Sequence, residues 1–150
     1  MKLKRISKSG QLTFYTPEAT KGPEIPLFSS PTSAGFPSPA DDYIETRLDI
    51  SKMLIKNPDA TYYVRVEGES MKDAGINNGA LLVVDRSLDP KNNSIAICSI
   101  NGEFTVKRIT IRKNELYLKP ENDQFKPIKV TEFDNFMVWG VVTFIIQKPL

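Results

Sequence analysis

Ser94-Ile95-Ala96-Ile97-Cys98-Ser99-Ile100-Asn101-Gly102-Glu103-Phe104-Thr105-Val106-Lys107 contains two strand-like runs separated by Asn-Gly. Asn-Gly favours a type I′ turn, which needs positive φ at both central positions. The stretch therefore predicts a β hairpin that pairs the strand ending at Ile100 with the strand carrying Lys107. With these two, the strand-like runs beyond residue 60 occupy residues 61–66, 80–84, 94–100, 103–111, 116–118 and 136–146. This pattern predicts a mainly β domain.

The N-terminal part of the chain has a different composition. Residues 1–40 contain six of the eleven prolines, many Ser and Thr, and little apolar periodicity. This composition predicts a flexible N-terminal arm over residues 1–40, followed by a domain over residues 41–150. Two short helices are expected where the domain begins. Asp41 or Asp42 can cap the first, through Tyr43–Leu48, and the second starts at Ser51 and stops near Asn57-Pro58.

Composition and charge exclude several classes of protein. No apolar run approaches the roughly 18 residues of a membrane span, and no apolar segment follows the basic start as in a secretory signal, so we expect a soluble, cytoplasmic protein. A net charge of +2 is small for a nucleic-acid-binding domain. The single cysteine, Cys98, cannot form an intramolecular disulfide, and the absence of histidine removes the usual zinc sites. We expect a buried Cys98 and no metal or cofactor.

A candidate nucleophile follows the first strand of the domain. Val66-Glu67-Gly68-Glu69-Ser70-Met71 places Ser70 directly after strand-like residues and two positions after a glycine. A serine hydroxyl needs a base to accept its proton. Because the chain has no histidine, Ser-His-Asp and Cys-His arrangements are excluded, and a lysine is the remaining candidate base. The lysine to test is Lys107.

Strand alternation gives Lys107 a partly apolar environment. Thr105, Lys107, Ile109 and Ile111 fall on one face of the predicted strand. Among apolar neighbours an ammonium is poorly solvated, so its pKa falls and the amine can be neutral near physiological pH. The alternative is that Lys107 is a lysine of an edge strand and lies in water.

A candidate substrate lies in the predicted arm. Ser29-Ser30-Pro31-Thr32-Ser33-Ala34-Gly35-Phe36-Pro37 combines two very small residues, Ala34 and Gly35, with prolines that disfavour helix. An extended backbone with small side chains is what a protease cleft accepts. The alternative is a linker whose small residues only confer flexibility.

These motifs occur together in an order that resembles the self-cleaving serine peptidases of the LexA and UmuD group. The resemblance covers roughly residues 27–147. It rests on Ala34-Gly35, Gly68-Glu69-Ser70-Met71 with Gly75-Ile76, Leu81-Leu82-Val83-Val84-Asp85, Gly102-Glu103-Phe104-Thr105-Val106-Lys107, and Trp139-Gly140-Val141-Val142. Within the group the chain is most similar to UmuD, because Phe36–Tyr43 directly follows the small pair and a proline-rich arm stands where LexA-type repressors carry a DNA-binding domain.

The resemblance implies a function and a set of roles. Ser70 would be the nucleophile and Lys107 the general base, and the chain would cut its own Ala34-Gly35 bond. The backbone N–H groups of Ser70 and Met71 would bind the oxyanion. The family fold is a largely β peptidase domain of the LexA/UmuD type, which forms a homodimer.

The resemblance also implies partners. A RecA filament on single-stranded DNA would promote the cleavage. The product would serve as an SOS-response accessory subunit of an error-prone Y-family polymerase, with a UmuC-like catalytic subunit. No sequence-specific DNA binding and no membrane partner are expected.

Three features depart from the family pattern. Ala34 stands where UmuD proteins can have cysteine, Asn78-Gly79-Ala80 replaces an Asp-Gly-Asp turn, and the arm is longer and more basic at its start.

Two other functions stay open: a phage or plasmid regulator that competes for partners, and a non-enzymatic polymerase subunit in which the site is a relic. Signal peptidases also use Ser and Lys, but they are held at the membrane by an anchor. The arm could enter its own cleft or that of a dimer partner.

Overall fold

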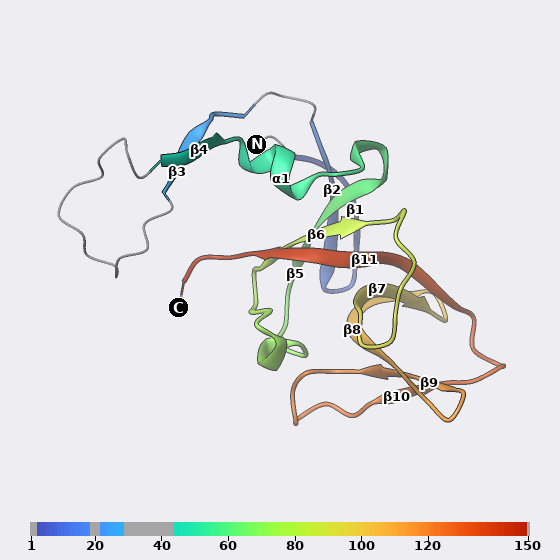
Figure 1. Cartoon of the computed structure of the whole chain (residues 1–150). Coiled ribbons are helices and arrows are strands. Elements are labelled where there is room, and N and C mark those ends of the chain that lie inside the picture. Colours follow the sequence, from blue (N-terminus) through green and yellow to red (C-terminus); the bar gives the residue numbers. More distant parts are fainter. Residues whose placement is uncertain (1–2, 19–21, 29–43, 150) are drawn as a thin grey trace.

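The structure is a computed structural model that describes residues 3–18, 22–28 and 44–149. Its main feature is a nine-stranded antiparallel sheet with strand order β1-β2-β5-β6-β11-β7-β8-β9-β10, and β3 and β4 form a second sheet (Figure 1). The elements are β1 (Leu3–Ser9), β2 (Leu12–Pro17), β3 (Ile25–Phe28), β4 (Ile44–Leu48), α1 (Ile50–Leu54), η2 (Pro58–Ala60), β5 (Thr61–Val66), η3 (Lys72–Ala74), β6 (Leu81–Asp85), β7 (Ile95–Ile100), β8 (Glu103–Arg112), β9 (Glu115–Lys119), β10 (Ile128–Val130) and β11 (Phe136–Ile146). The mainly β prediction is confirmed.

The six strands predicted beyond residue 60 are β5, β6, β7, β8, β9 and β11, each within one residue of its expected ends. The turn between β7 and β8 has φ of 51° at Asn101 and 83° at Gly102, as the type I′ prediction requires. β7 and β8 pair antiparallel from Ile95↔Arg108 to Ile100↔Glu103. β8 also pairs with β9, so Lys107 lies on an interior strand and the edge-strand alternative for it is wrong.

Of the two predicted helices, only the second exists. α1 starts at Ile50, one residue before the predicted Ser51, because Asp49 caps it: Oδ1 of Asp49 accepts the N–H of Ser51 at 3.0 Å. The helix predicted through Tyr43–Leu48 is wrong, since Ile44–Leu48 forms β4 and pairs with β3. Pairing with β3 stabilises this segment as a strand more than a helix cap would stabilise it as a helix. The proposed caps, Asp41 and Asp42, lie outside the described residues.

The structure also differs from the expected arm over residues 1–40. Leu3–Ser9 and Leu12–Pro17 form a hairpin, and β2 pairs antiparallel with β5 over Leu12–Tyr15. The turn uses Gly10 at φ 55°. Leu12 and Phe14 are only 2% and 3% exposed. The proline content of the whole segment concealed this short apolar strand, which precedes most of the prolines.

The main core lies inside the curve of the long sheet. Four strands separate β2 from β8 in the sheet order, yet the Phe14 and Phe104 rings meet with centroids 5.4 Å apart. The sheet therefore curls strongly. Phe14, Val64, Met71, Ile76, Leu82, Val84, Ile97 and Val106 belong to this core. Cys98 is fully buried in a neighbouring cluster, as predicted. No helix within the described ranges has the length and apolar character to cross a bilayer.

β11 pairs with both β6 and β7, and it bends at two register shifts, one of them between Val138 and Gly140. Gly140 is buried at this bend. A Cβ at this position would lie 2.6 Å from Cγ1 of Val84, itself fully buried. The close approach of β11 to β6 therefore requires glycine.

We predict that Gly140→Ala lowers the free energy of unfolding by about 1–3 kcal/mol, because the added methyl group would overlap the fully buried Val84 side chain. Chemical denaturation followed by circular dichroism measures this. Glu132→Ala, in the exposed segment before β11, is the control and should change the value by less than about 0.5 kcal/mol. An equal effect of the two substitutions would contradict the packing argument.

Candidate active site

Ser70 lies in the loop between β5 and η3, where it is partly exposed. The next residue, Met71, is 1% exposed and inserts into the main core, as does Ile76. The Ile76 N–H donates to the carbonyl of Met71 at 3.2 Å. Gly68 has φ of 98°, a conformation that side chains disfavour, and it turns the chain after β5. Ser70 is therefore held at the surface by a buried residue directly after it.

Hydrogen bonds from three distant segments fix this loop. Nδ2 of Asn122, a residue only 6% exposed, donates to the carbonyl of Glu69 at 2.8 Å. The N–H of Glu67 donates to the carbonyl of Gln11 at 2.8 Å. The N–H of Gly68 donates to Oδ1 of Asn78, also at 2.8 Å. Asn78, one of the departures noted in the sequence, thus supplies an acceptor for the Ser70 loop.

Lys107 extends from the middle of β8 toward this loop. Its backbone pairs with Ala96 of β7. Nζ of Lys107 lies 3.1 Å from Oγ of Ser70, which is hydrogen-bond distance. The two residues that the sequence singled out as nucleophile and base are 37 positions apart in the chain, and the fold brings their functional atoms together.

The other contacts of Nζ suit a neutral amine. Nζ of Lys107 donates to Oγ1 of Thr105 at 2.7 Å and to the carbonyl oxygen of Val106 at 3.1 Å. A neutral amine has two N–H donors and one lone pair. With both donors used by Thr105 and Val106, the lone pair is left for the third neighbour, the hydroxyl of Ser70. Ser70 can then donate its proton to Lys107, as general-base catalysis requires.

Burial also favours the neutral form. Desolvation lowers the pKa of the Lys107 amine below its usual value, and the nearby Cys98 acts in the opposite direction. Burial raises the pKa of the Cys98 thiol to about 12, although the charge of Lys107 lowers it. The thiol is therefore uncharged near neutral pH and places no anion beside Lys107. Net desolvation makes Lys107 a stronger candidate base than a solvated lysine.

Two backbone donors lie next to the hydroxyl. Within the part of the chain that the structure describes, the N–H groups of Ser70 and Met71 have no hydrogen-bond acceptor. Unpaired N–H groups beside a nucleophile can bind the oxygen of a tetrahedral intermediate. The described residues contain no group of His, Cys, Asp or Glu able to hold a metal ion.

A cleft of about 530 Å³ opens beside Lys107. The tip of the β1–β2 hairpin, Ser9–Gln11, lines it, and so do Phe125 and Ile128. Thr105 and Phe104 line it as well. A space of this size, with mixed polar and apolar walls, suits an extended peptide. Ala34 and Gly35, the predicted substrate, lie outside the described residues.

Sequence reasoning missed several of these supporting residues. Thr105 could have been found, because alternation places it on the face of Lys107. Asn122 follows β9 in a loop whose position depends on tertiary packing, so nothing in its neighbours indicated a link to Glu69. Gln11 was missed because residues 1–40 were interpreted as an arm.

We predict that Lys107→Met changes how stability depends on pH. Because burial lowers the folded-state pKa of Lys107, the unfolded chain binds more protons between that value and about 10.5, and stability rises with pH in this window. The wild type should therefore gain free energy of unfolding relative to Lys107→Met as the pH rises toward about 10.5.

Denaturant titrations of both chains at several pH values measure the difference between their free energies of unfolding. Burial also raises the pKa values of Cys98 and Tyr63. Both chains contain these residues, so their contributions cancel in the difference. Lys119→Met, an exposed lysine on β9, is the control and should run parallel to the wild type. A constant difference between the wild type and Lys107→Met would show that Lys107 is solvated.

Comparison with known proteins agrees with this geometry. Residues 26–143 match the Peptidase S24-like family. Protein ImpA of Salmonella typhimurium is 45% identical over 123 residues, which cover 82% of this chain and 83% of ImpA. Protein MucA of Escherichia coli is 41% identical over 140 residues, covering 91% and 94%. The LexA repressor of Hahella chejuensis is 36% identical over 137 residues, covering 85% and 68%. The chain therefore belongs to the Peptidase S24-like family, as a UmuD-like autoproteolytic serine peptidase of SOS mutagenesis.

Proposed function

We propose that Ser70 is the nucleophile and Lys107 the general base of self-cleavage at Ala34-Gly35. The observation that carries the proposal is the 3.1 Å separation of Ser70 Oγ and Lys107 Nζ. The remaining donors of the amine are already used, and burial lowers its pKa. A hydroxyl and a neutral amine in contact are the minimum set for Ser/Lys catalysis.

The reaction follows from these atoms. Lys107 takes the proton of Ser70 as Oγ attacks the carbonyl carbon of Ala34. The N–H groups of Ser70 and Met71 bind the resulting oxyanion. Lys107 then gives its proton to the nitrogen of Gly35, and the C–N bond breaks, leaving Ala34 as an ester on Ser70. A water molecule, deprotonated by Lys107, hydrolyses the ester and restores the free hydroxyl.

The cellular role is a second part of the proposal. We infer that a RecA filament on single-stranded DNA stimulates the cleavage, and that the shortened protein acts in the cytoplasm as a homodimer. Its partner would be a UmuC-like Y-family polymerase, which would perform translesion synthesis. These partners follow from the resemblance to UmuD, and the relatedness to ImpA and MucA supports them.

Two alternatives predict a different state of the site. A relic site in a non-enzymatic subunit would have no reason to keep a buried lysine, whose desolvation opposes folding whenever it is charged. A regulator that only competes for partners would likewise not need Asn122 to fix the carbonyl beside Ser70. The intact contacts of Ser70 and Lys107 favour the enzyme over both.

We predict that the purified chain, incubated at alkaline pH, yields a fragment whose first residue is Gly35, because Lys107 is then deprotonated. Ser70→Ala and Lys107→Arg should each cleave at least about a thousandfold more slowly. Arginine keeps the charge but cannot act as a base. Mass spectrometry of the fragments over time gives the rates.

Lys119→Ala, which removes an exposed lysine from β9, is the control and should cleave like the wild type. Continued cutting at Ala34-Gly35 by both the Ser70 and the Lys107 variants would rule out the dyad.

We further predict that Asn122→Ala slows self-cleavage about ten- to a hundredfold while Ser70 and Lys107 stay intact. The substitution removes the donor that holds the Glu69 carbonyl, so the loop before Ser70 gains freedom. Asp123→Ala, the exposed neighbour, should cleave at the wild-type rate. The same time course measures both, and equal rates for the two variants would mean that Asn122 does not position the nucleophile.

A further inference from the structure

The segment that self-cleavage would separate is built into the folded domain. β1, β2 and β3 all precede Ala34-Gly35 in the chain, and β4 and β5 follow it. β2 pairs with β5 over four residues, Leu12–Tyr15, and β3 pairs with β4. The N–H of Gly22 also donates to Oδ2 of Asp49 at 3.2 Å. Cutting one bond between Phe28 and Ile44 removes none of these pairings.

Phe14 of β2 is the main apolar anchor of this segment. Its side chain is 3% exposed and belongs to the main core. Its ring meets Trp139 edge-on at a centroid distance of 4.9 Å and Phe104 at 5.4 Å. Both aromatic partners belong to strands on the C-terminal side of the cut. Large, well-packed aromatic side chains of this kind contribute most of the affinity in protein interfaces.

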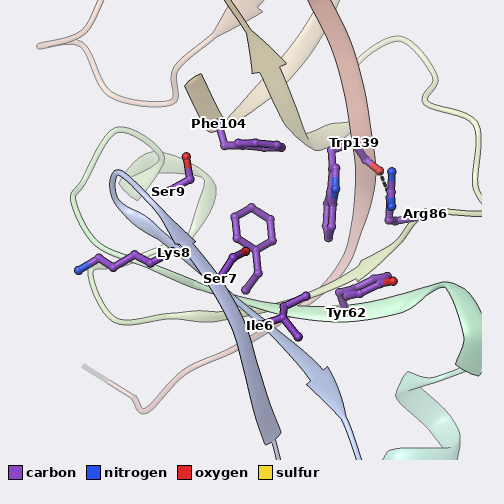
Figure 2. A pocket seen from close by; sticks show the side chains of 9 residues that line it. Ile6, Ser7, Lys8, Ser9, Tyr62, Arg86, Phe104 and Trp139 are labelled. Carbon is purple, nitrogen blue, oxygen red and sulfur yellow. Dashed lines mark hydrogen bonds between the residues drawn. The ribbon is translucent and has the colours of Figure 1, made fainter. Parts of the chain in front are cut away.

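The surface that receives the hairpin is aromatic and ordered by its own contacts. Figure 2 shows Tyr62, Phe104 and Trp139 around a pocket that residues 6–9 of β1 also line. The pocket has a volume of about 380 Å³. The Arg86 guanidinium stacks on Trp139, 4.6 Å from the ring centroid, and its Nε donates to the Trp139 carbonyl at 2.9 Å. Both contacts of Arg86 lie on the C-terminal side of the cut, so they hold Trp139 without any residue of the hairpin.

The hairpin also lines the cleft beside Lys107. Its tip, Ser9–Gln11, forms one wall beside Lys107. The carbonyl of Gln11 accepts the N–H of Glu67, three residues before Ser70. Loss of the hairpin would therefore remove both a wall of the cleft and a support of the nucleophile loop.

We propose that the edge of β5 that pairs with β2, together with Tyr62, Phe104 and Trp139, is a binding site for an antiparallel β hairpin, and that residues 3–17 remain bound there after cleavage. The ligand class is a strand that pairs with β5 and inserts an aromatic side chain at the position of Phe14. The proposal rests on the proposed cleavage at Ala34-Gly35. It implies that cutting alone does not expose β5, and that the N-terminal piece leaves only when another strand displaces it.

The test is made on the full chain after self-cleavage. The cut protein is diluted to the nanomolar range and analysed by size exclusion and native mass spectrometry. We expect the 1–34 piece to travel with the 35–150 piece. Phe14→Ala should weaken the association at least about a hundredfold, from the cost of removing a buried aromatic ring. Separate elution of the two wild-type pieces would overturn the proposal.

Two further variants keep the test decisive. Phe133→Ala removes the same side chain from a position that is 89% exposed, and it should leave the association unchanged. If Phe14→Ala does not fold, Phe14→Leu, which keeps an apolar side chain, should weaken the association by about tenfold. Equal association of the Phe14 and Phe133 variants would remove Phe14 as the anchor and contradict the proposed site.

A second route separates this proposal from the proposed function. The recognition sequence of a sequence-specific protease is inserted between Thr32 and Ser33 of the Ser70→Ala chain, and that protease makes the cut. If the wild type does not cleave itself but these pieces stay together, the proposed function fails and the retained hairpin stands. If the wild type cleaves itself and the pieces separate by both routes, the retained hairpin fails alone.

Discussion

The contact between Lys107 and Ser70 sets conditions that the rest of the structure has to satisfy. An ammonium is stable in water and costly inside a sheet, so a lysine on an interior strand is stable there only when it can become neutral or finds acceptors. Lys107 meets both conditions, because burial lowers its pKa and two oxygen acceptors lie beside Nζ. The burial that lowers the pKa of Lys107 therefore comes from the fold itself, because β8 has a strand on either side.

Ser70, the proposed nucleophile, depends on a different kind of support. Ser70 is in a loop, and loops lack the repeated hydrogen bonds of a sheet. Buried Met71 fixes the position after the serine, and Asn122 fixes the carbonyl before it. A misplacement of about 1 Å at a nucleophile can cost two orders of magnitude in rate. The anchoring of this short loop on both sides of the serine therefore affects the rate, although less than the loss of the hydroxyl itself would.

Much of this structure could be predicted from the sequence. The strands from β5 onward, the Asn101-Gly102 turn and the approach of Lys107 to Ser70 follow from local patterns and family motifs, because strand alternation and turn chemistry act over a few residues. β4 and the β1–β2 hairpin could not be predicted, since their partners, β3 and β5, are distant in the chain or carry weak signals. Asn122 was missed for the same reason: its bond to Glu69 spans 53 positions.

The hairpin changes what the N-terminal segment means for the enzyme. Interpreted as an arm, residues 1–40 are only substrate. In the structure, residues 9–11 form a wall of the cleft and Gln11 holds the chain three residues before Ser70. The same segment that precedes the proposed cleavage bond therefore also lines the cleft beside Lys107, the proposed base. If Ser70 and Lys107 cut that bond, the cleft keeps this lining only while the hairpin stays bound, so the two proposals, self-cleavage and a retained hairpin, are physically linked.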